Sequence, residues 1–206
     1  MLSPLQEQVA AIIAGLAEAE GFALAGGAAL IARGDVERQT RDLDFFGLIP
    51  DAVDRLLPAL DRALHDAGLV VRHVQENHGF ARLIVESGDD RTELDLGADA
   101  RLFPAEPGWP APTLSGEELA VDKVLAVFGR AEARDFVDLA AIEERYGLDR
   151  LFELAAEKDR GFTPEMFAEM ASRFSRLRED EFDIDADEYD ELADRVAAWR
   201  EHALGR

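Results

Sequence analysis

Two aspartates one residue apart, Asp42 and Asp44, are the residues whose type and spacing point most directly to chemistry. The apolar residues Phe45 and Phe46 follow at once, which is typical of a buried strand. Side chains two residues apart in a strand point to the same face, so both carboxylates should lie on one side. Carboxylate oxygens are hard ligands that suit Mg²⁺, and the pair therefore predicts a metal site.

A pair of glycines, Gly26 and Gly27, is the second candidate group. It follows the apolar segment 22–25 and precedes a short helix predicted over 28–32. Free backbone N–H groups at a helix N-terminus bind phosphate. A glycine pair at this place also serves a tight turn with close helix–strand packing. Beside the two aspartates, the glycines favour metal-dependent chemistry on a nucleoside triphosphate.

A third carboxylate is expected from the segment 92–96. Two metal ions about 3.5 to 4 Å apart activate an attacking oxygen and hold a leaving group, and they need several carboxylates. Glu93 and Asp95 share a strand face. We prefer Asp95 because it lies between two leucines in the apolar part of the strand, and Glu93 is the alternative.

Two polar residues, Arg38 and Thr40, stand just ahead of the aspartates. A guanidinium and a hydroxyl at these positions can reach phosphate or orient Asp42. They extend the predicted site toward the nucleotide.

Basic residues form a further group between 114 and 139. At about 100° per residue, four side chains fall within about 80° of one another if the helix is unbroken. They are Lys123, Arg130, Arg134 and Asp138. A lysine whose stem packs on an apolar surface, or an ordinary helix ion pair, explains Lys123 equally well.

The N-terminal segments, which must position these residues, show both helical and strand periodicity. Helices are predicted over 5–20, 28–32 and 51–67, and strands over 22–25, 42–47, 69–75, 80–86 and 92–96. We therefore expect an α+β fold for residues 1–103.

A proline-containing loop over 98–113 marks the expected domain boundary. Helices are predicted beyond it over 116–146, with a candidate break near 129–133, and over 149–158, 164–177 and 186–204. We expect residues 114–206 to form a helical domain that completes the active-site cleft.

The composition limits the class of protein. With 206 residues and 48% hydrophobic content, the chain can build a real core. Cysteine is absent, which excludes disulfides and thiolate chemistry and fits a reducing cytoplasm. No apolar run approaches the roughly 20 residues that cross a bilayer. We expect a cytoplasmic protein without a membrane partner.

The net charge of −22 argues against DNA as a partner. Segment 179–195 holds ten acidic residues and one arginine, which is typical of a solvated helix face. An acidic helical interaction module is therefore one interpretation of the C-terminal half.

The motifs resemble those of the AbiEii/AbiGii-type nucleotidyltransferases over roughly residues 20 to 145. This family shares the DNA polymerase β-like nucleotidyltransferase fold and includes toxins of abortive-infection and toxin–antitoxin systems. Its glycine-pair motif is similar to Phe22-Ala23-Leu24-Ala25-Gly26-Gly27-Ala28-Ala29-Leu30. Its Arg-x-Ser/Thr-x-Asp-x-Asp motif is similar to Arg38-x-Thr40-x-Asp42-x-Asp44-Phe45. Its third motif is similar to Glu117-Glu118-Leu119 with Lys123, Arg130, Arg134-Asp135 and Asp138-Leu139.

The resemblance implies a mixed β-sheet core with flanking helices, followed by a C-terminal helical bundle. It implies two Mg²⁺ ions, with Mn²⁺ as the alternative, held by Asp42, Asp44 and Asp95. Asp95 would also help to deprotonate an acceptor hydroxyl. The implied nucleotide-binding residues are Gly26, Gly27, Arg38, Thr40, Lys123, Arg130 and Arg134. Asp135 and Asp138 would hold the basic side chains in place.

The implied reaction moves a nucleoside monophosphate from a nucleoside triphosphate to a hydroxyl of a protein or RNA acceptor. A cognate antitoxin is the implied partner. The net charge favours a protein acceptor, whereas an arginine cluster would favour RNA if the fold gathered Arg130, Arg134, Arg173, Arg176 and Arg178. The alternative is a catalytically inactive nucleotide-binding or partner-binding protein on the same fold. Glycine at position 27 replaces the serine common in this fold.

Overall fold

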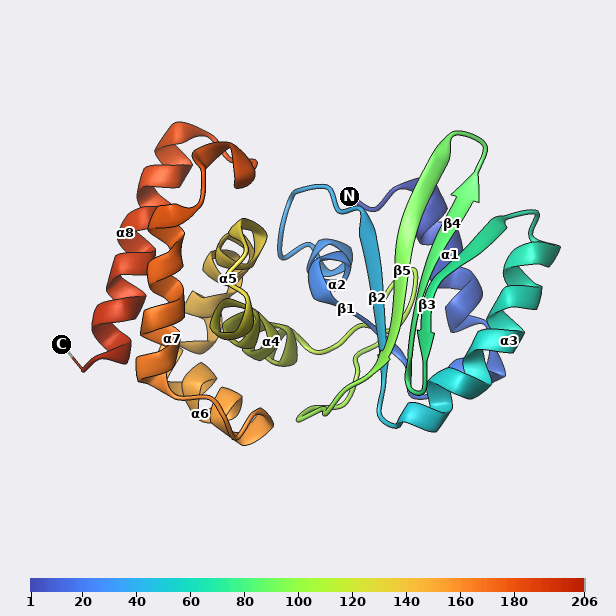
Figure 1. Cartoon of the computed structure of the whole chain (residues 1–206), viewed down its shortest axis with the longest axis horizontal. Coiled ribbons are helices and arrows are strands. Elements are labelled where there is room, and N and C mark those ends of the chain that lie inside the picture. Colours follow the sequence, from blue (N-terminus) through green and yellow to red (C-terminus); the bar gives the residue numbers. More distant parts are fainter. Residues whose placement is uncertain (206) are drawn as a thin grey trace. The chain divides into compact units, whose positions relative to one another are not determined.

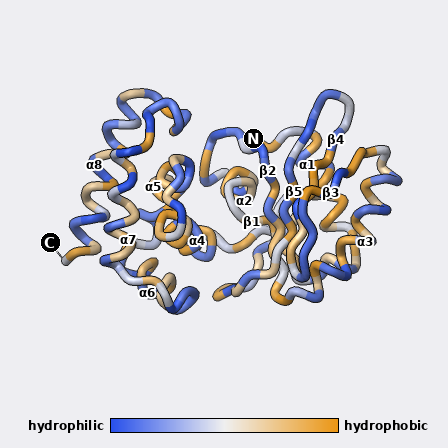
Figure 2. The backbone as a smooth tube through the Cα atoms, viewed as in Figure 1, coloured by the Kyte–Doolittle hydropathy of each residue, from blue (hydrophilic) through white to orange (hydrophobic). Residues whose placement is uncertain are grey.

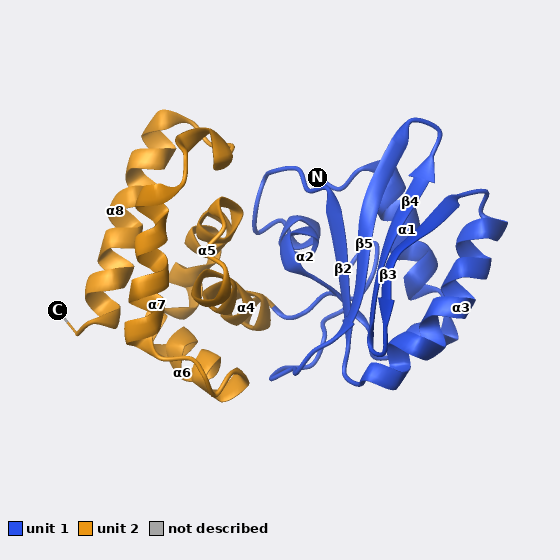
Figure 3. Ribbon diagram, in the orientation of Figure 1, with its two compact units in different colours: residues 1–115 blue, residues 116–206 orange. Residues whose placement is uncertain are grey.

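The computed structural model describes residues 1–205 and divides into two compact units. The first unit is Met1–Ser115 and the second is Gly116–Arg206 (Figure 3). The proline-containing segment 104–113 lies within the first unit. Its residues 112–114 run along β1, because Leu24 donates its backbone N–H to Pro112 and accepts one from Leu114.

The first unit combines helices with a five-stranded mixed sheet, so the predicted α+β fold class is confirmed (Figure 1). Its helices are α1 (Pro4–Ala14), the short 3-10 helix η1 (Ala17–Ala19), α2 (Gly26–Arg33) and α3 (Pro50–Asp66). Its strands are β1 (Ala23–Ala25), β2 (Asp42–Gly47), β3 (Val70–Asn77), β4 (Phe80–Ser87) and β5 (Asp90–Ala98). The prediction of a single helix over 5–20 is wrong, because α1 ends at Ala14 with Gly15 as its C-cap.

The sheet has the strand order β1-β2-β5-β4-β3. β3, β4 and β5 form an antiparallel meander, and β1 pairs antiparallel with β2. β2 and β5 pair in parallel, with α3, β3 and β4 between them in the chain. The two strands that carry the predicted carboxylates are therefore neighbours that run in the same direction.

Alternation along β2 separates the core from the polar face. Leu43 and Phe45 are buried, whereas Asp42 and Asp44 are half-buried on the opposite face. Helices α1 and α3 pack on the sheet, and hydrophobic and hydrophilic stretches alternate along α3 (Figure 2). At the start of α1, the Ser3 hydroxyl accepts the backbone N–H of Gln6, and the Gln6 side chain accepts that of Ser3.

The second unit is helical, as predicted. It contains α4 (Gly116–Gly129), α5 (Ala133–Tyr146), α6 (Leu148–Lys158), α7 (Pro164–Ala171), η2 (Ser172–Arg176), η3 (Glu179–Glu181) and α8 (Ala186–Ala203). The candidate break near 129–133 is confirmed, because α4 and α5 are separate helices. Ala131 lies between them with φ 54°.

Aromatic side chains build much of the core of the second unit. Phe152 packs on Phe167 with ring centroids 4.9 Å apart, and Phe136 packs edge-on against Phe174 at 5.3 Å. Trp199 is fully buried and donates its indole N–H to the Glu143 carboxylate at 3.2 Å. No helix among residues 1–205 is long and apolar enough to span a membrane.

We predict that Glu143 makes the stability of the chain depend on pH. Burial raises the pKa of Glu143, against the opposing effects of Arg195 and Trp199. A raised pKa means that the contribution of Glu143 to the free energy of unfolding is full below its unfolded pKa, about 4.3. This contribution is lost as the pH rises through the folded pKa. Replacing Glu143→Gln should therefore remove this loss.

The measurement is the free energy of unfolding by urea at a series of pH values from about 4 upward. As the pH rises, the free energy of unfolding of Glu143→Gln should increase relative to that of the native chain. The matched control is Glu144→Gln, an exposed neighbour that also contacts Arg195. Curves that stay parallel for the native chain and Glu143→Gln would contradict the account.

Candidate active site

The register of β2 and β5 places four carboxylates on one face of the sheet. Asp42 pairs with Glu93, and Asp44 pairs with Asp95, in consecutive positions of the parallel ladder. Residues two apart in a strand share a face, so these four side chains lie on the same side. Asp95 is buried, and the other three are half-buried.

The glycine pair lies against this face at the start of α2. Ala25 pairs with Asp44 across β1 and β2, so the chain turns into α2 next to that carboxylate. A Cβ at Gly26 would collide with the Asp44 carboxylate, and a Cβ at Gly27 would collide with the Arg38 guanidinium. Gly26 also has φ +59°, which side chains rarely adopt. The absence of side chains thus lets the N-terminus of α2 approach both groups.

Thr40 orients the first aspartate. Its hydroxyl donates a hydrogen bond to Oδ1 of Asp42 at 2.5 Å. Arg38 donates from Nη1 to the backbone carbonyl of Gln39 at 2.8 Å. The structure therefore gathers the predicted residues of the segments 26–27 and 38–44 where β1, α2 and β2 meet, and Asp95 lies beside them on β5.

Arg82 of β4 is a charged member of this site that the sequence analysis missed. It pairs with Asp95 across β4 and β5. Its Nε donates to Asp95 Oδ1 at 2.7 Å and its Nη2 to Oδ2 at 2.5 Å, while Nε lies 3.3 Å from Glu93. These hydrogen bonds to Asp95 raise the pKa of Arg82, and the charges of Asp95, Glu93 and Asp44 add to the effect. The only local signal was one arginine in an apolar strand.

Two buried polar residues support the backbone ahead of Asp42. Gln6 donates from Nε2 to the carbonyl of Thr40 at 3.0 Å. The hydroxyl of Thr92 donates to the carbonyl of Arg41 at 3.1 Å, and Gln6 also contacts this hydroxyl at 3.4 Å. Helix α1 and strand β5 thereby fix the segment that enters β2. A glutamine on the buried face of α1 is the signal that sequence reasoning passed over.

The carboxylates of Asp42 and Asp44 fit Mg²⁺ in kind, since they offer hard oxygens next to a helix N-terminus. Both carboxylate oxygens of Asp95 accept hydrogen bonds from the Arg82 guanidinium. Within residues 1–205, one group of three acidic or histidine side chains has ligand atoms within 4.8 Å of one another, and it lies elsewhere.

That other group is Asp51, Asp54 and His78, and all three are exposed. His78 Nδ1 lies 2.6 Å from Asp54, and the Gly79 N–H donates to the same carboxylate at 3.1 Å. The hydrogen bond to Asp54 raises the pKa of His78. These hydrogen bonds brace the turn between β3 and β4.

The predicted basic residues of the second unit are held by acidic ones. Lys123 is buried, with Nζ 2.8 Å from Asp138 and 3.6 Å from Asp135. Arg130 makes two hydrogen bonds of 2.8 Å to Asp135. Arg134 donates to Glu132 at 3.0 Å.

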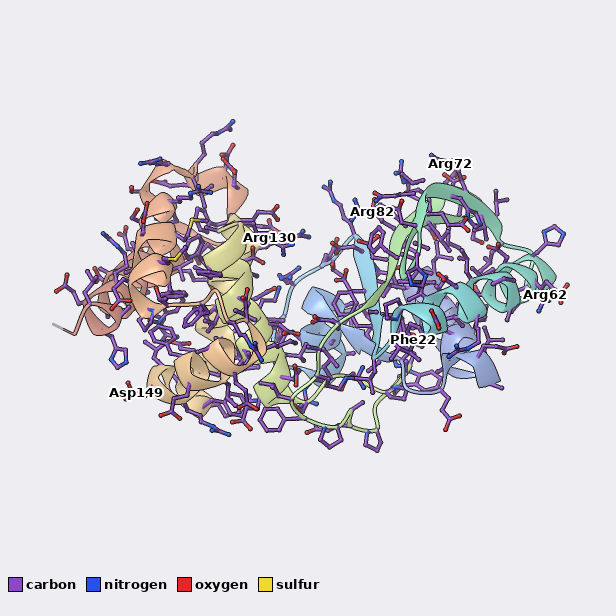
Figure 4. The ribbon with its side chains drawn as sticks, turned by 60° about the horizontal axis from the view of Figure 1, so that its bottom comes forward. Phe22, Arg62, Arg72, Arg82, Arg130 and Asp149 are labelled. Atoms are coloured by element: carbon purple, nitrogen blue, oxygen red, sulfur yellow. The ribbon has the colours of Figure 1, made fainter. Side chains whose placement is uncertain are left out.

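The single basic stripe expected from helical periodicity is wrong. It required an unbroken helix from Lys123 to Asp138, and residues 130–132 interrupt the helix. Arg130, labelled in Figure 4, directly follows the last residue of α4 and is exposed. Arg134 is exposed in the first turn of α5, whereas Lys123 is buried in α4. The three cations therefore have different surroundings.

Comparisons with known proteins agree on the type of fold. The family model described as nucleotidyl transferase AbiEii toxin, type IV TA system, matches residues 10–202. MenT4, a nucleotidyltransferase toxin of Mycobacterium tuberculosis H37Rv, has a similar structure with a TM-score of 0.63 at 17% identity, covering 98% of this chain and 90% of that one. JHP933 of Helicobacter pylori gives a TM-score of 0.56 at 17% identity, covering 98% and 93%. At this identity the likeness shows the fold. No curated protein matches the chain.

We predict that Gly26→Ala destabilises the first unit more than a change of backbone preference explains. The matched control is Gly34→Ala, because Gly34 has φ +76° and no atom within 4 Å of its Cβ position. The control should lower the free energy of unfolding by about 1 kcal/mol. Gly26→Ala should lower it by roughly 3 kcal/mol, because it also forces the Asp44 carboxylate to move.

Urea denaturation of both variants measures the difference. Equal decreases in the free energy of unfolding for Gly26→Ala and Gly34→Ala would show that the close approach of α2 to Asp44 does not affect stability.

Proposed function

Because the chain belongs to the AbiEii nucleotidyl transferase toxin family, we propose that it transfers a nucleoside monophosphate from a nucleoside triphosphate to a hydroxyl group. The acceptor oxygen forms a bond to the α-phosphorus, the bond from that phosphorus to its bridging oxygen breaks, and pyrophosphate leaves. The proton of the acceptor hydroxyl passes to a carboxylate of the site. Mg²⁺ is the proposed cofactor.

One observation supports this proposal above the others. The parallel register of β2 and β5 puts Asp44 beside Asp95 and Asp42 beside Glu93. The glycine pair brings the N-terminus of α2 against the same carboxylates. A helix N-terminus favours phosphate, and paired carboxylates favour a divalent cation. Both halves of a metal–triphosphate complex therefore find complementary groups within the first unit.

The following site residues of the first unit have distinct proposed roles. Asp42 and Asp44 would hold Mg²⁺, which when bound supplies positive charge against the phosphate oxygens. Thr40 fixes the orientation of Asp42 through its 2.5 Å hydrogen bond. Gly26 and Gly27 present backbone N–H groups to the triphosphate. Asp95 is the proposed acceptor of the hydroxyl proton, with Glu93 as the alternative.

The roles of the residues in the second unit remain predictions that rest on the family motif. Lys123, Arg130 and Arg134 are proposed to neutralise triphosphate charge, with Asp135 and Asp138 orienting them. The contacts of Asp138 to Lys123 and of Asp135 to Arg130 support the orienting role. A protein or an RNA is the proposed acceptor, and the net charge of −22 favours protein. A cognate antitoxin is the proposed partner, as the type IV family description implies.

The second candidate function is nucleotide binding without catalysis. It is favoured by the Arg82–Asp95 pair, because Arg82 occupies both oxygens of a carboxylate that the transfer reaction would need. Labelling separates the two functions, since a binding protein transfers nothing.

We predict that label from the α-phosphate of a nucleoside triphosphate enters protein or RNA of a cell lysate in the presence of Mg²⁺. Label from the γ-phosphate should not be transferred, because it leaves with pyrophosphate. Asp42→Asn and Asp44→Asn should each lower the initial rate roughly a hundredfold or more, because charge stabilisation by a metal is worth several kcal/mol. Each of the four nucleotides is tested separately.

The control is Asp61→Asn, which makes the same change at a partly exposed carboxylate that contacts His73. It should retain the native rate. Transfer of the γ-label, or equal α-labelling by the native chain and both site variants, would rule out the proposed reaction.

A further inference from the structure

Arg82 occupies a position that conflicts with a simple metal site. It covers both oxygens of Asp95, the carboxylate proposed as third member of the site. The Asp95 side chain is 12% exposed, whereas that of Arg82 is 38% exposed. One side of the guanidinium thus faces the carboxylates while part of the side chain remains accessible. A cation and this guanidinium compete for the same oxygens.

The competition has an electrostatic origin. Four carboxylates on one face of β2 and β5 repel one another unless a positive charge lies among them. Arg82 supplies such a charge, with its Nε 2.7 Å from Asp95 and 3.3 Å from Glu93. It is therefore a neutralising group of the site.

We propose that Arg82 is a positioning residue that couples metal binding to nucleotide binding. It holds Asp95 while the triphosphate is absent. It releases Asp95 when the triphosphate offers the guanidinium another anionic partner. This inference rests on the proposed nucleotidyl transfer, and it names a residue that the family motifs do not include.

The chemistry of arginine suits this exchange. A guanidinium makes the same forked pair of hydrogen bonds to a phosphate as to a carboxylate. Strand β4 holds Arg82 in register with Asp95, so the side chain can change partner without a change of backbone. By thermodynamic linkage, a triphosphate that removes Arg82 from Asp95 strengthens metal binding, and the metal strengthens triphosphate binding by the same factor.

The test measures Mn²⁺ affinity of the full chain without nucleotide, by electron paramagnetic resonance of free Mn²⁺. The variants are Arg82→Gln and Arg82→Lys. The matched control is Arg72→Gln, because Arg72 lies on the edge strand β3, apart from Arg82 in Figure 4, and contacts only Glu86 at 3.9 Å among the ion pairs recorded for residues 1–205. Thermal melting of each variant verifies that it is folded.

Arg82→Gln should bind Mn²⁺ about tenfold more tightly than the native chain, within the usual range of coupling between sites. Arg82→Lys should fall between the two, because it keeps the charge and loses the fork. Arg72→Gln should match the native chain. Adding the non-cleavable α,β-methylene analogue of the nucleotide that labels the acceptor should remove most of the difference.

Adding Asp42→Asn to Arg82→Gln assigns the Mn²⁺ to the carboxylates of the sheet. Loss of the affinity gain in this double variant supports the inference. Equal Mn²⁺ affinities of the native chain, Arg82→Gln and Arg72→Gln, all weakened by Asp42→Asn, would overturn the role of Arg82 and leave the proposed function intact. If Asp42→Asn leaves the Mn²⁺ affinity unchanged both in the native chain and in Arg82→Gln, the proposed metal site itself is overturned.

Discussion

The repulsion among four carboxylates on one face of a parallel strand pair is the constraint to which the rest of the first unit responds. The β2–β5 register creates it by pairing Asp42 with Glu93 and Asp44 with Asp95. Arg82 offsets part of the charge from the neighbouring strand. Thr40 fixes one carboxylate, and the glycine pair leaves room for a helix N-terminus beside another. A site of this kind costs stability when empty and favours a cationic ligand.

The second unit differs in that it buries its two lysines beside acidic side chains. The chain has two lysines, Lys123 and Lys158, and both are buried. Lys158 lies 2.6 Å from Glu118 and 2.5 Å from Asp122. Buried pairs stabilise only while both members are present, since removing one leaves an uncompensated charge. These two buried lysine clusters therefore help to fix how helices α4, α5 and α6 pack.

Local patterns predicted where most of the helices and strands lie, but not all of their ends. The strand with Asp42 and Asp44 and the turn at Gly26 could be read from adjacent residues, because alternation and glycine act over a few positions. Arg82 could not be read in this way. Its role depends on the antiparallel register of β4 with β5, which is set by contacts distant in sequence. The buried contacts of Gln6 depend on long-range packing for the same reason.

The prediction that Lys123, Arg130 and Arg134 share one helix face is wrong for a local reason, which the sequence only partly indicates. Ala131 takes φ 54° between α4 and α5, and this turn separates Lys123 from Arg134. Gly129 marked the place, but glycine within a helical pattern does not by itself decide between a kink and a break.

The most direct test of the central claim is a crystal structure of the full chain with Mn²⁺ and a non-cleavable triphosphate analogue, with the metal located by its anomalous scattering. We expect manganese at the carboxylates of Asp42 and Asp44, and Asp95 released from Arg82. Manganese found only at the exposed group of Asp51, Asp54 and His78, with the Arg82–Asp95 pair intact and the analogue bound away from Gly26, would contradict it.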